Sequence, residues 1–289
     1  MGISLTILTG LIWGGIGVVL EVATKRKINS WVFIAIASTL SSIGAWSFFV
    51  RWDVVSSGEI QKPFQTFIIL SIAGLFGTLG MVCLKKSMNA GASAWTVGQS
   101  SLVIPFIAGC ILFDKHIHIS GILGVSFILL CLFLFYQHTN SESKDKKPWF
   151  KDAILAFLFL GIQQTASSIP SSWDGWTDSA NLRVPILLTS GCIPLVFYVL
   201  IIKSKIQQGL WNLSVIYAIL VLIGQGCLFA AMDLLRKTQQ LSLTFPIALG
   251  TCILFITLWD IIKQKSVPSF LTISGILCGL LGIIFLSCH

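Results

Sequence analysis

The chain has 289 residues, of which 55% are hydrophobic and only 10% are charged, and its mean hydropathy is +0.90. A soluble domain carries about 25% charged residues, so this composition excludes a globular protein that folds in water. The net charge of +8 comes from short Lys and Arg clusters between apolar stretches, such as residues 25–27. Clusters in these places are typical of contact with lipid headgroups, and nucleic acid is not an expected partner.

Apolar runs bounded by charge, glycine or proline predict ten membrane-spanning helices. A spanning helix needs about 20 mostly apolar residues, whereas barrel strands are shorter and alternate apolar with polar positions. Because lipid offers no hydrogen bonds to the backbone, runs of this length and pattern predict helices. In chain order the expected spans are 3–24, 30–50, 65–84, 92–113, 118–136, 151–170, 183–202, 213–235, 240–262 and 270–287.

A polar stretch near the midpoint divides these spans into two five-helix halves. We expect a first repeat over residues 1–139, a polar linker over 140–150 and a second repeat over 151–289. The same five letters, Ile-Ser-Gly-Ile-Leu, begin the fifth span at Ile119 and the tenth span at Ile273. Two glycines of the first half also recur at a constant offset of 147 residues: Gly14 with Gly161, and Gly77 with Gly224. These matches, in the same order, indicate a duplication.

An odd number of helices in each repeat has a geometric consequence. After five crossings, the second copy starts from the opposite side of the membrane. The two copies are then inverted and related by a pseudo-two-fold axis in the membrane plane. The predicted fold is therefore an all-α integral membrane protein with ten transmembrane helices, arranged as two inverted five-helix repeats around a central cavity.

This organisation resembles the EamA branch of the drug/metabolite transporter superfamily, over nearly the whole chain. The family pattern has a small-residue helix with a Ser-Pro step, an acidic residue at the helix end, and then a glycine-rich last helix. Pro246 stands 14 residues before Asp260, as in that pattern. In the first half Asp114 is present, but Pro105 lies nine residues before it and Ser101 occupies the place expected for proline.

The resemblance implies a carrier that moves small organic molecules across the bacterial inner membrane by alternating access. It also implies a cavity lined by helices one, three, four, six, eight and nine, and no bound cofactor. The expected partners are a small-molecule substrate, a coupling ion such as H⁺ and membrane lipid, with the chain acting as a monomer or weak homodimer. The resemblance implies cytoplasmic termini, whereas the distribution of Lys and Arg favours external termini.

Polar and aromatic side chains inside the predicted spans are the candidates for substrate binding. Polar groups are costly in lipid and usually face a cavity or a partner helix. Amides both donate and accept, which suits zwitterionic or neutral polar substrates, and Trp offers a flat apolar wall that can hold a cation. The candidates are Trp13, Trp95, Gln99, Ser100, Gln163, Gln164 and Gln225. The alternatives are hydrogen bonds between packed helices for the amides and contact with lipid for the tryptophans.

The acidic residues in or near the spans have two possible roles. Glu21 is the carboxylate inside the first span, which makes it the candidate for proton coupling. Lys25 lies four residues further along the helix, so an ion pair is the favoured alternative. The same pairing with neighbouring Lys or Arg is expected for the acids at span ends: Asp114, Asp233 and Asp260.

Other function classes have weaker signals. The sequence contains no Walker A motif, no HExxH and no GxSxG, and an SxxK match at residues 141–144 lies in the polar linker. No catalytic residues and no enzyme activity are therefore expected. The eight cysteines occur singly and His116-x-His118 stands alone in a short loop, so no metal site is expected. A membrane receptor, sensor or scaffold that binds a small ligand without transporting it is the alternative to a transporter.

Overall fold

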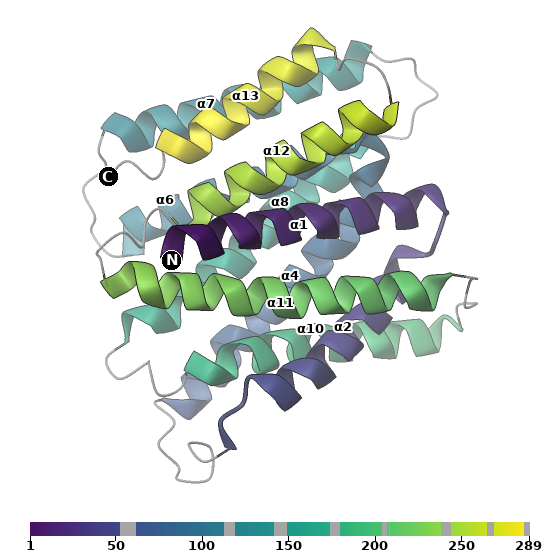
Figure 1. Cartoon of the computed structure of the whole chain (residues 1–289), viewed down its shortest axis with the longest axis vertical. Helices are drawn as coiled ribbons and strands as arrows, with labels where there is room; N and C mark the ends of the chain where they lie inside the picture. The colour runs from purple at the N-terminus through teal and green to yellow at the C-terminus, as the bar shows by residue number, and fades with distance from the viewer. Residues whose placement is uncertain are drawn as a thin grey trace.

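The computed structural model describes residues 1–52, 62–112, 119–141, 149–173, 180–203, 207, 209–237, 244–264 and 269–285 (Figure 1). Every regular element in these residues is helical, which confirms the predicted all-α class. The first half contains α1 (Gly2–Lys25), α2 (Ser30–Phe48), α4 (Pro63–Ser87), α5 (Ala92–Gln99), α6 (Val103–Leu112) and α7 (Ile119–Ser141). The second half contains α8 (Trp149–Ser168), α10 (Arg183–Ile201), α11 (Leu210–Lys237), α12 (Thr244–Gln264) and α13 (Phe270–Phe285).

Nine of the predicted spans each correspond to one α-helix, with ends that agree within five residues. The span predicted over residues 92–113 is instead broken into α5, a 3₁₀ turn at Ser100–Leu102, and α6. Pro105 explains the break, because proline has no N–H to donate and its ring clashes with the carbonyl four residues earlier, at Ser101. With this broken helix taken as one, the described residues form ten long helical segments. α7 also extends to Ser141, two residues into the predicted linker.

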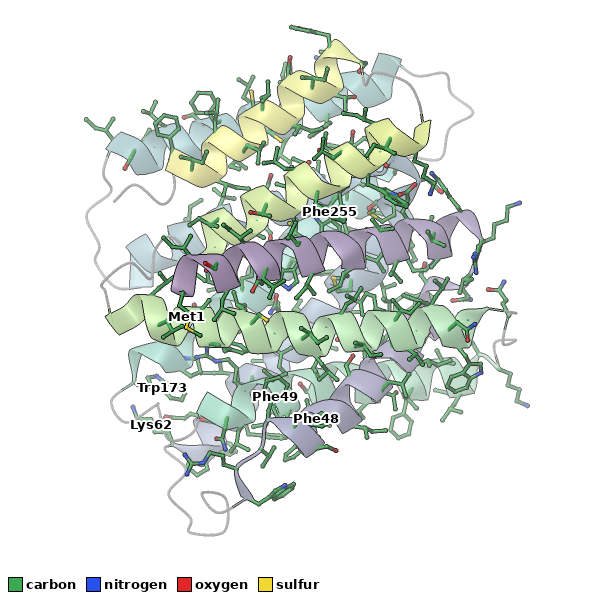
Figure 2. All side chains as sticks on the ribbon, viewed as in Figure 1. Met1, Phe48, Phe49, Lys62, Trp173 and Phe255 are labelled. Atoms are coloured by element: carbon green, nitrogen blue, oxygen red, sulfur yellow. The ribbon has the colours of Figure 1, made fainter. Side chains whose placement is uncertain are left out.

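Five of these helices are long and apolar enough to cross a membrane, and two shorter apolar helices accompany them. The five are Gly2–Lys25, Ser30–Phe48, Pro63–Ala90, Arg183–Ile201 and Leu210–Met232. Large aromatic side chains also point outward: Phe48 is 82% exposed, Phe64 75% and Phe270 82% (Figure 2 labels Phe48). Exposure of this much apolar surface to water is unfavourable, whereas lipid chains solvate it. The chain is therefore a multi-pass membrane protein.

The helices pack as neighbouring pairs. α4 lies along α8, α1 lies along α11, and α7 lies along α13. α1 also packs on α12, and α10 packs on both α2 and α4. In Figure 1 the α7–α13 pair forms one edge of the bundle and α2 with α10 the opposite edge. The five helices α1, α4, α8, α11 and α12 lie between these edges, where they surround the centre of the bundle (Figure 1).

One end of the bundle carries a contact between a cation and an aromatic side chain. Trp173 follows the 3₁₀ turn at Ile169–Ser172, and the Nζ atom of Lys62 lies 5.2 Å from the centroid of its ring (Figure 2). A cation over an indole ring is a favourable pairing, and both groups are common at the level of the headgroups. This contact joins the start of α4 to the chain segment that follows α8.

Candidate functional site

The bundle encloses a cavity of about 200 Å³ that is partly open. Its walls come from α1, α2, α4, α5, α8, α10, α11 and α12. The cavity extends from Trp95 and Gln99, in the fourth helical segment, to Ser168 and Arg183, where α8 ends and α10 begins. Ser168 is exposed, so the cavity meets the surface at this end.

Six of the seven candidate substrate-binding residues line this cavity: Trp13, Trp95, Gln99, Gln163, Gln164 and Gln225. They come from four helices and are separated by up to 212 positions along the chain. The seventh candidate, Ser100, lies outside the lining. Its hydroxyl is fully buried and donates a 2.8 Å hydrogen bond to the Thr96 carbonyl. The side chain lies on the side of the helix that faces Gly279 of α13. The 3₁₀ turn that begins at Ser100 directs this side chain away from the cavity.

Glycines of neighbouring helices position two of the lining side chains. A methyl carbon placed on Gly77 of α4 would lie 2.8 Å from Cγ of Gln163, so the aliphatic stem of this glutamine lies directly on the glycine. A methyl carbon on Gly224 of α11 would lie 3.1 Å from Nε1 of Trp13. Both glycines belong to the pair that recurs at the offset of 147. They let α8 approach α4, and α1 approach α11, closely enough for these side chains to reach the hollow.

The glutamine that follows Gln163 has an unsatisfied acceptor. Oε1 of Gln164 is buried, and no donor among the described residues lies within hydrogen-bonding distance. A buried carbonyl oxygen without a donor is unfavourable by roughly 1–3 kcal/mol, so most such groups find a partner or a water molecule. Because Gln164 lines the cavity, a donor group on a bound molecule would satisfy this oxygen.

The sequence analysis missed several lining residues, of which Arg183 is the most informative. The sequence placed it at a loop boundary, where an Arg side chain usually extends to the headgroups. In the structure its side chain lines the cavity and the residue is only 6% exposed, with Cζ 5.0 Å from the centroid of the Phe229 ring. Leu187, four residues further along α10, lines the same cavity. This spacing is the signal that could have assigned Arg183 to the inner face of the helix.

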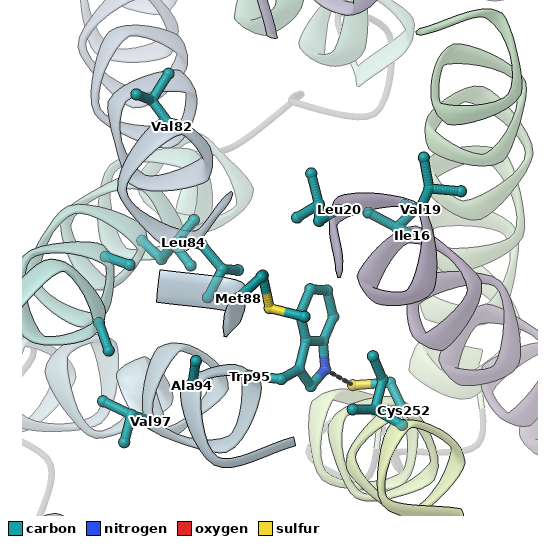
Figure 3. Close-up of a cluster of buried hydrophobic side chains, with 14 of the residues drawn as sticks. Ile16, Val19, Leu20, Val82, Leu84, Met88, Ala94, Trp95, Val97 and Cys252 are labelled. Carbon is teal, nitrogen blue, oxygen red and sulfur yellow. Dashed lines mark hydrogen bonds between the residues drawn. The ribbon is translucent and has the colours of Figure 1, made fainter. Parts of the chain in front are cut away.

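A layer of fully buried side chains closes the opposite end of the cavity (Figure 3). Trp95 lies at its centre, and its indole N–H donates to Sγ of Cys252 in α12 over 3.3 Å. Leu20, Leu84 and Met88 are each 0% exposed and surround the Trp95 ring in this close-up. The layer joins α1, α4, α5 and α12, and it separates the cavity from this end of the bundle.

Polar contacts lie beyond this layer, at the end where α1 ends and α5 begins. Lys85 is 1% exposed, and its Nζ atom donates to the Ile28 carbonyl over 2.7 Å. The Thr24 hydroxyl donates to the Lys85 carbonyl over 2.7 Å. These bonds join α1 and α4 to the turn between α1 and α2, and they add to the closure of this end.

Glu21 lies in the same polar region, as an ion-pair partner. It is 1% exposed and pairs with Lys25, as the spacing of four residues predicted. It also accepts a 3.0 Å hydrogen bond from Nε1 of Trp259 and a 3.3 Å contact from Nζ of Lys263. The carboxylate therefore joins α1 to α12. It does not line the cavity, and its candidate role in proton coupling stays a prediction.

The other acids at span ends have different outcomes. Asp260 was expected to pair with a neighbouring cation, and it interacts electrostatically with Lys25 and Lys263. The structure adds a hydrogen bond that the sequence did not predict. The Oδ2 atom of Asp260 accepts a 2.6 Å hydrogen bond from the backbone N–H of Ala92, at the first residue of α5. A carboxylate at this place satisfies a free N–H and interacts favourably with the helix dipole. Asp114, His116 and His118, and the side chain of Asp233, lie outside the described residues.

Glu21→Gln separates the structural role of this residue from proton coupling. We expect the free energy of unfolding to fall by about 1–2 kcal/mol, because the neutral amide loses two lysine partners that are themselves partly exposed. We expect the pH dependence of transport to stay as in the wild type. Thermal unfolding in detergent and uptake measured over a range of pH give the two readouts. Unchanged stability together with a lost pH dependence would assign Glu21 to proton coupling instead.

Comparison with known proteins identifies a similar fold but no family. No protein-family model matches the chain, and no curated protein matches it either. A solved structure described only as "Crystal structure of protein" is similar, with a TM-score of 0.62 and 13% sequence identity. The match covers 98% of this chain and 96% of that chain. At this identity the likeness shows the fold alone, so nearly the whole chain shares its fold with a solved protein of similar length.

Proposed function

We propose that this chain is a secondary transporter that moves a small organic molecule across the bacterial inner membrane by alternating access. The cavity carries the proposal, because four amide side chains from three helices line one hollow inside an apolar bundle. Polar groups at this depth are costly in a membrane protein, and they usually mark the path of a solute or ion. The proposal includes membership of the EamA branch, ten crossings, and no chemical change of the solute.

The packing of the helices supports an inverted repeat. We number the long helical segments from one to ten in chain order, with α5 and α6 counted together, and exchange each segment for the one five places away. The contact of α4 with α8 then becomes the contact of α11 with α1, and the contact of α4 with α10 becomes that of α11 with α2. All four contacts are present. Such an exchange is the relation that a pseudo-two-fold axis would impose on two copies of one unit.

Individual side chains follow the same relation. Gly14 packs against Phe255 of α12, and its counterpart Gly161 packs against Ile104 of α6. The pseudo-axis would bring residues at equivalent positions together where a helix meets its own copy. Ser42 of α2 and Thr189 of α10 are 147 positions apart, and their hydroxyls lie 2.6 Å from one another. The sequence offset and the contacts therefore support the same two-fold arrangement.

Inverted copies supply a route for alternating access. The cavity meets the surface at the end where α8 ends, and the layer around Trp95 closes the other end. If the two halves exchanged conformations, a layer built from the equivalent residues would close the first end and open the second. The chain contains no Walker A sequence, so we assign the driving force to a proton or solute gradient, or to exchange.

The test of this function is transport in reconstituted vesicles with Gln163→Ala and Gln99→Ala. The solute is first found by uptake of a labelled panel: amino acids, nucleosides, organic acids, choline-like amines and cationic drugs. Each variant is then expected to lower the rate of uptake about threefold to tenfold, which corresponds to the loss of one hydrogen bond in the cavity. Yield and elution in gel filtration should stay as in the wild type, because both side chains line the hollow and alanine favours the helix.

The matched control is Ser126→Ala, which removes an exposed hydroxyl on α7 outside the cavity lining. Among the described residues, this hydroxyl donates to the Ile122 carbonyl of its own helix. This variant should transport at the wild-type rate. Wild-type rates in both glutamine variants would show that the cavity is not the solute path. A solute that binds and never crosses the vesicle membrane would replace the transporter with a receptor or sensor.

A further inference from the structure

The cavity has a polar face along α8. This helix contributes four polar side chains to the described lining: Gln163, Gln164, Ser167 and Ser168. Spacings of one and four residues place them on one side of the helix, and Ser168 lies at the open end. A few polar groups in an otherwise apolar pocket fix the orientation of a ligand. The α8 face therefore binds the polar side of a solute.

The other copy of the proposed repeat contributes an apolar face. At the offset of 147 residues, Gln163 of α8 is equivalent to Ile16 of α1, and both line the cavity. Leu160 and Trp13 are a second equivalent pair in the lining. α11, which packs along α1, adds mainly apolar side chains and one amide, that of Gln225. The two copies therefore differ in polarity at equivalent positions, which makes the cavity amphipathic.

The serines of the α8 face present acceptors to the cavity. The Ser167 hydroxyl donates to the Gln164 carbonyl over 3.1 Å, and the Ser168 hydroxyl donates to the Thr165 carbonyl over 2.8 Å. A serine hydroxyl has one O–H to donate and two lone pairs that accept. Since both O–H groups are used within α8, the two hydroxyl oxygens serve a ligand as acceptors.

The side chain of Gln164 adds an acceptor that has no donor. Its Oε1 atom is buried, and no described residue donates to it. Burial of such an atom without a partner is unfavourable, and a donor on a bound solute removes that cost. The last torsion of a glutamine side chain is soft, so a small rotation turns the oxygen toward the ligand. The α8 face therefore selects a solute that has a hydrogen-bond donor.

We propose that the solute is amphipathic and carries an N–H or O–H donor, which binds Oε1 of Gln164 while its apolar body lies against Trp13 and Ile16. This inference rests on the proposed transport function, because it names the solute class of the same cavity. It gives the two equivalent helices different roles. α8 selects the donor group, and α1 binds the apolar body whatever the polar group is.

Two pairs of neutral probes test the donor requirement: phenylacetamide with N,N-dimethylphenylacetamide, and benzyl alcohol with its methyl ether. In each pair, methyl groups replace the donor hydrogens and the aromatic body stays the same. Binding to the purified protein in detergent is measured by titration calorimetry, after subtraction of the heat from empty micelles. The donor of each pair should bind about threefold to tenfold more tightly, which corresponds to one hydrogen bond. Equal binding within both pairs, or no binding of any probe at millimolar concentration, would overturn the proposal.

Variants then assign the preference to one residue. Gln164→Met keeps the length of the side chain and removes the acceptor, so the members of each pair should bind equally. The matched control is Gln65→Met, which removes an amide from an exposed position on α4 outside the cavity lining and should keep the wild-type preference. Gel filtration reports folding. If Gln164→Met does not fold, Gln164→Asn decides in the same way, because its acceptor is withdrawn by one methylene. A full preference in the folded variant would overturn the proposal.

Trp13→Leu tests where the apolar body lies. Leucine is the residue at the equivalent position of α8, Leu160, so it suits a helix of this bundle. All four probes should bind about threefold to tenfold more weakly, because the ring provides apolar contact area for each of them. The ratio within each pair should stay as in the wild type. Unchanged affinities together with a lost donor preference would contradict the assignment of the two faces.

Competition with transport keeps this inference separate from the proposed function. Uptake of a labelled solute that the donor probes inhibit more strongly than their methylated partners supports both. Donor probes that bind with the expected preference, together with no uptake of any solute of the panel, support the binding site and contradict the transporter. Uptake that both members of each pair inhibit equally contradicts the donor site and leaves the transporter in place.

Discussion

Replacement of Trp95 by alanine is expected to lower the free energy of unfolding by about 3 kcal/mol, and to remove transport. Trp95 is 1% exposed and lies where α1, α5 and α12 meet. A Trp or Phe to Ala change in a soluble core costs about 3–5 kcal/mol, from lost transfer energy and from the cavity that remains. In lipid the transfer part is small, because the unfolded helices are also in an apolar solvent, so the cost comes mainly from lost packing.

The Trp95 variant affects transport for a separate reason. The side chain is both a wall of the cavity and the centre of the layer that closes one end. Without the ring, the cavity would extend toward that end and access would no longer be limited to one side. Trp95→Phe keeps most of the ring and loses the bond to Cys252, so it should cost only about 1 kcal/mol.

The measurement is thermal unfolding in detergent, combined with vesicle uptake. Trp211→Ala is the matched control, because this indole is 53% exposed on the outer face of α11. It should change the stability by less than about 0.5 kcal/mol, the usual range for a surface position. Equal losses in the Trp95 and Trp211 variants would show that the layer around Trp95 does not hold these helices together.

The second large effect is expected for Gly74→Ala, at the seam between α4 and α10. A methyl carbon on Gly74 would overlap the backbone carbonyl oxygen of Leu187 and the hydroxyl of Ser190. The reverse approach is equally close, since a methyl carbon on Gly191 would lie 2.5 Å from the Gly74 carbonyl oxygen. A backbone carbonyl cannot rotate away, so the two helices must separate. Such overpacking costs about 1–3 kcal/mol and should lower the unfolding temperature in detergent.

The control for this variant lies at another glycine of the bundle. A methyl carbon on Gly250 of α12 would have its nearest neighbour at 3.8 Å, Cδ2 of Leu280, which is an ordinary contact. Gly250→Ala should therefore leave stability unchanged or raise it, because alanine favours a helix by up to about 1 kcal/mol over glycine. A Gly74→Ala protein that unfolds at the wild-type temperature would contradict the close approach of α4 and α10.

The sequence by itself determined the solvent of this protein and the order and ends of its helices. Hydropathy is a local property, because each run must satisfy its own backbone in lipid whatever its neighbours are. The ends of α1, α2 and α10 follow from the apolar runs to within two residues. The glutamines and tryptophans could be proposed as cavity-lining residues from the sequence, since polar side chains in the middle of a span usually face a cavity or a partner helix.

The tertiary structure alone decided which side chains share a wall and which tie helices together. Arg183 lines the cavity because α10 turns that face toward Phe229 of α11, and Asp260 caps α5 because the end of α12 meets Ala92. Ser100 does not line the cavity, because Pro105 breaks the helix and the 3₁₀ turn at Ser100 changes the direction of its side chain. Each outcome depends on the rotation and approach of two helices that are far apart in the sequence. Hydropathy and spacing along one helix contain no information on that relation.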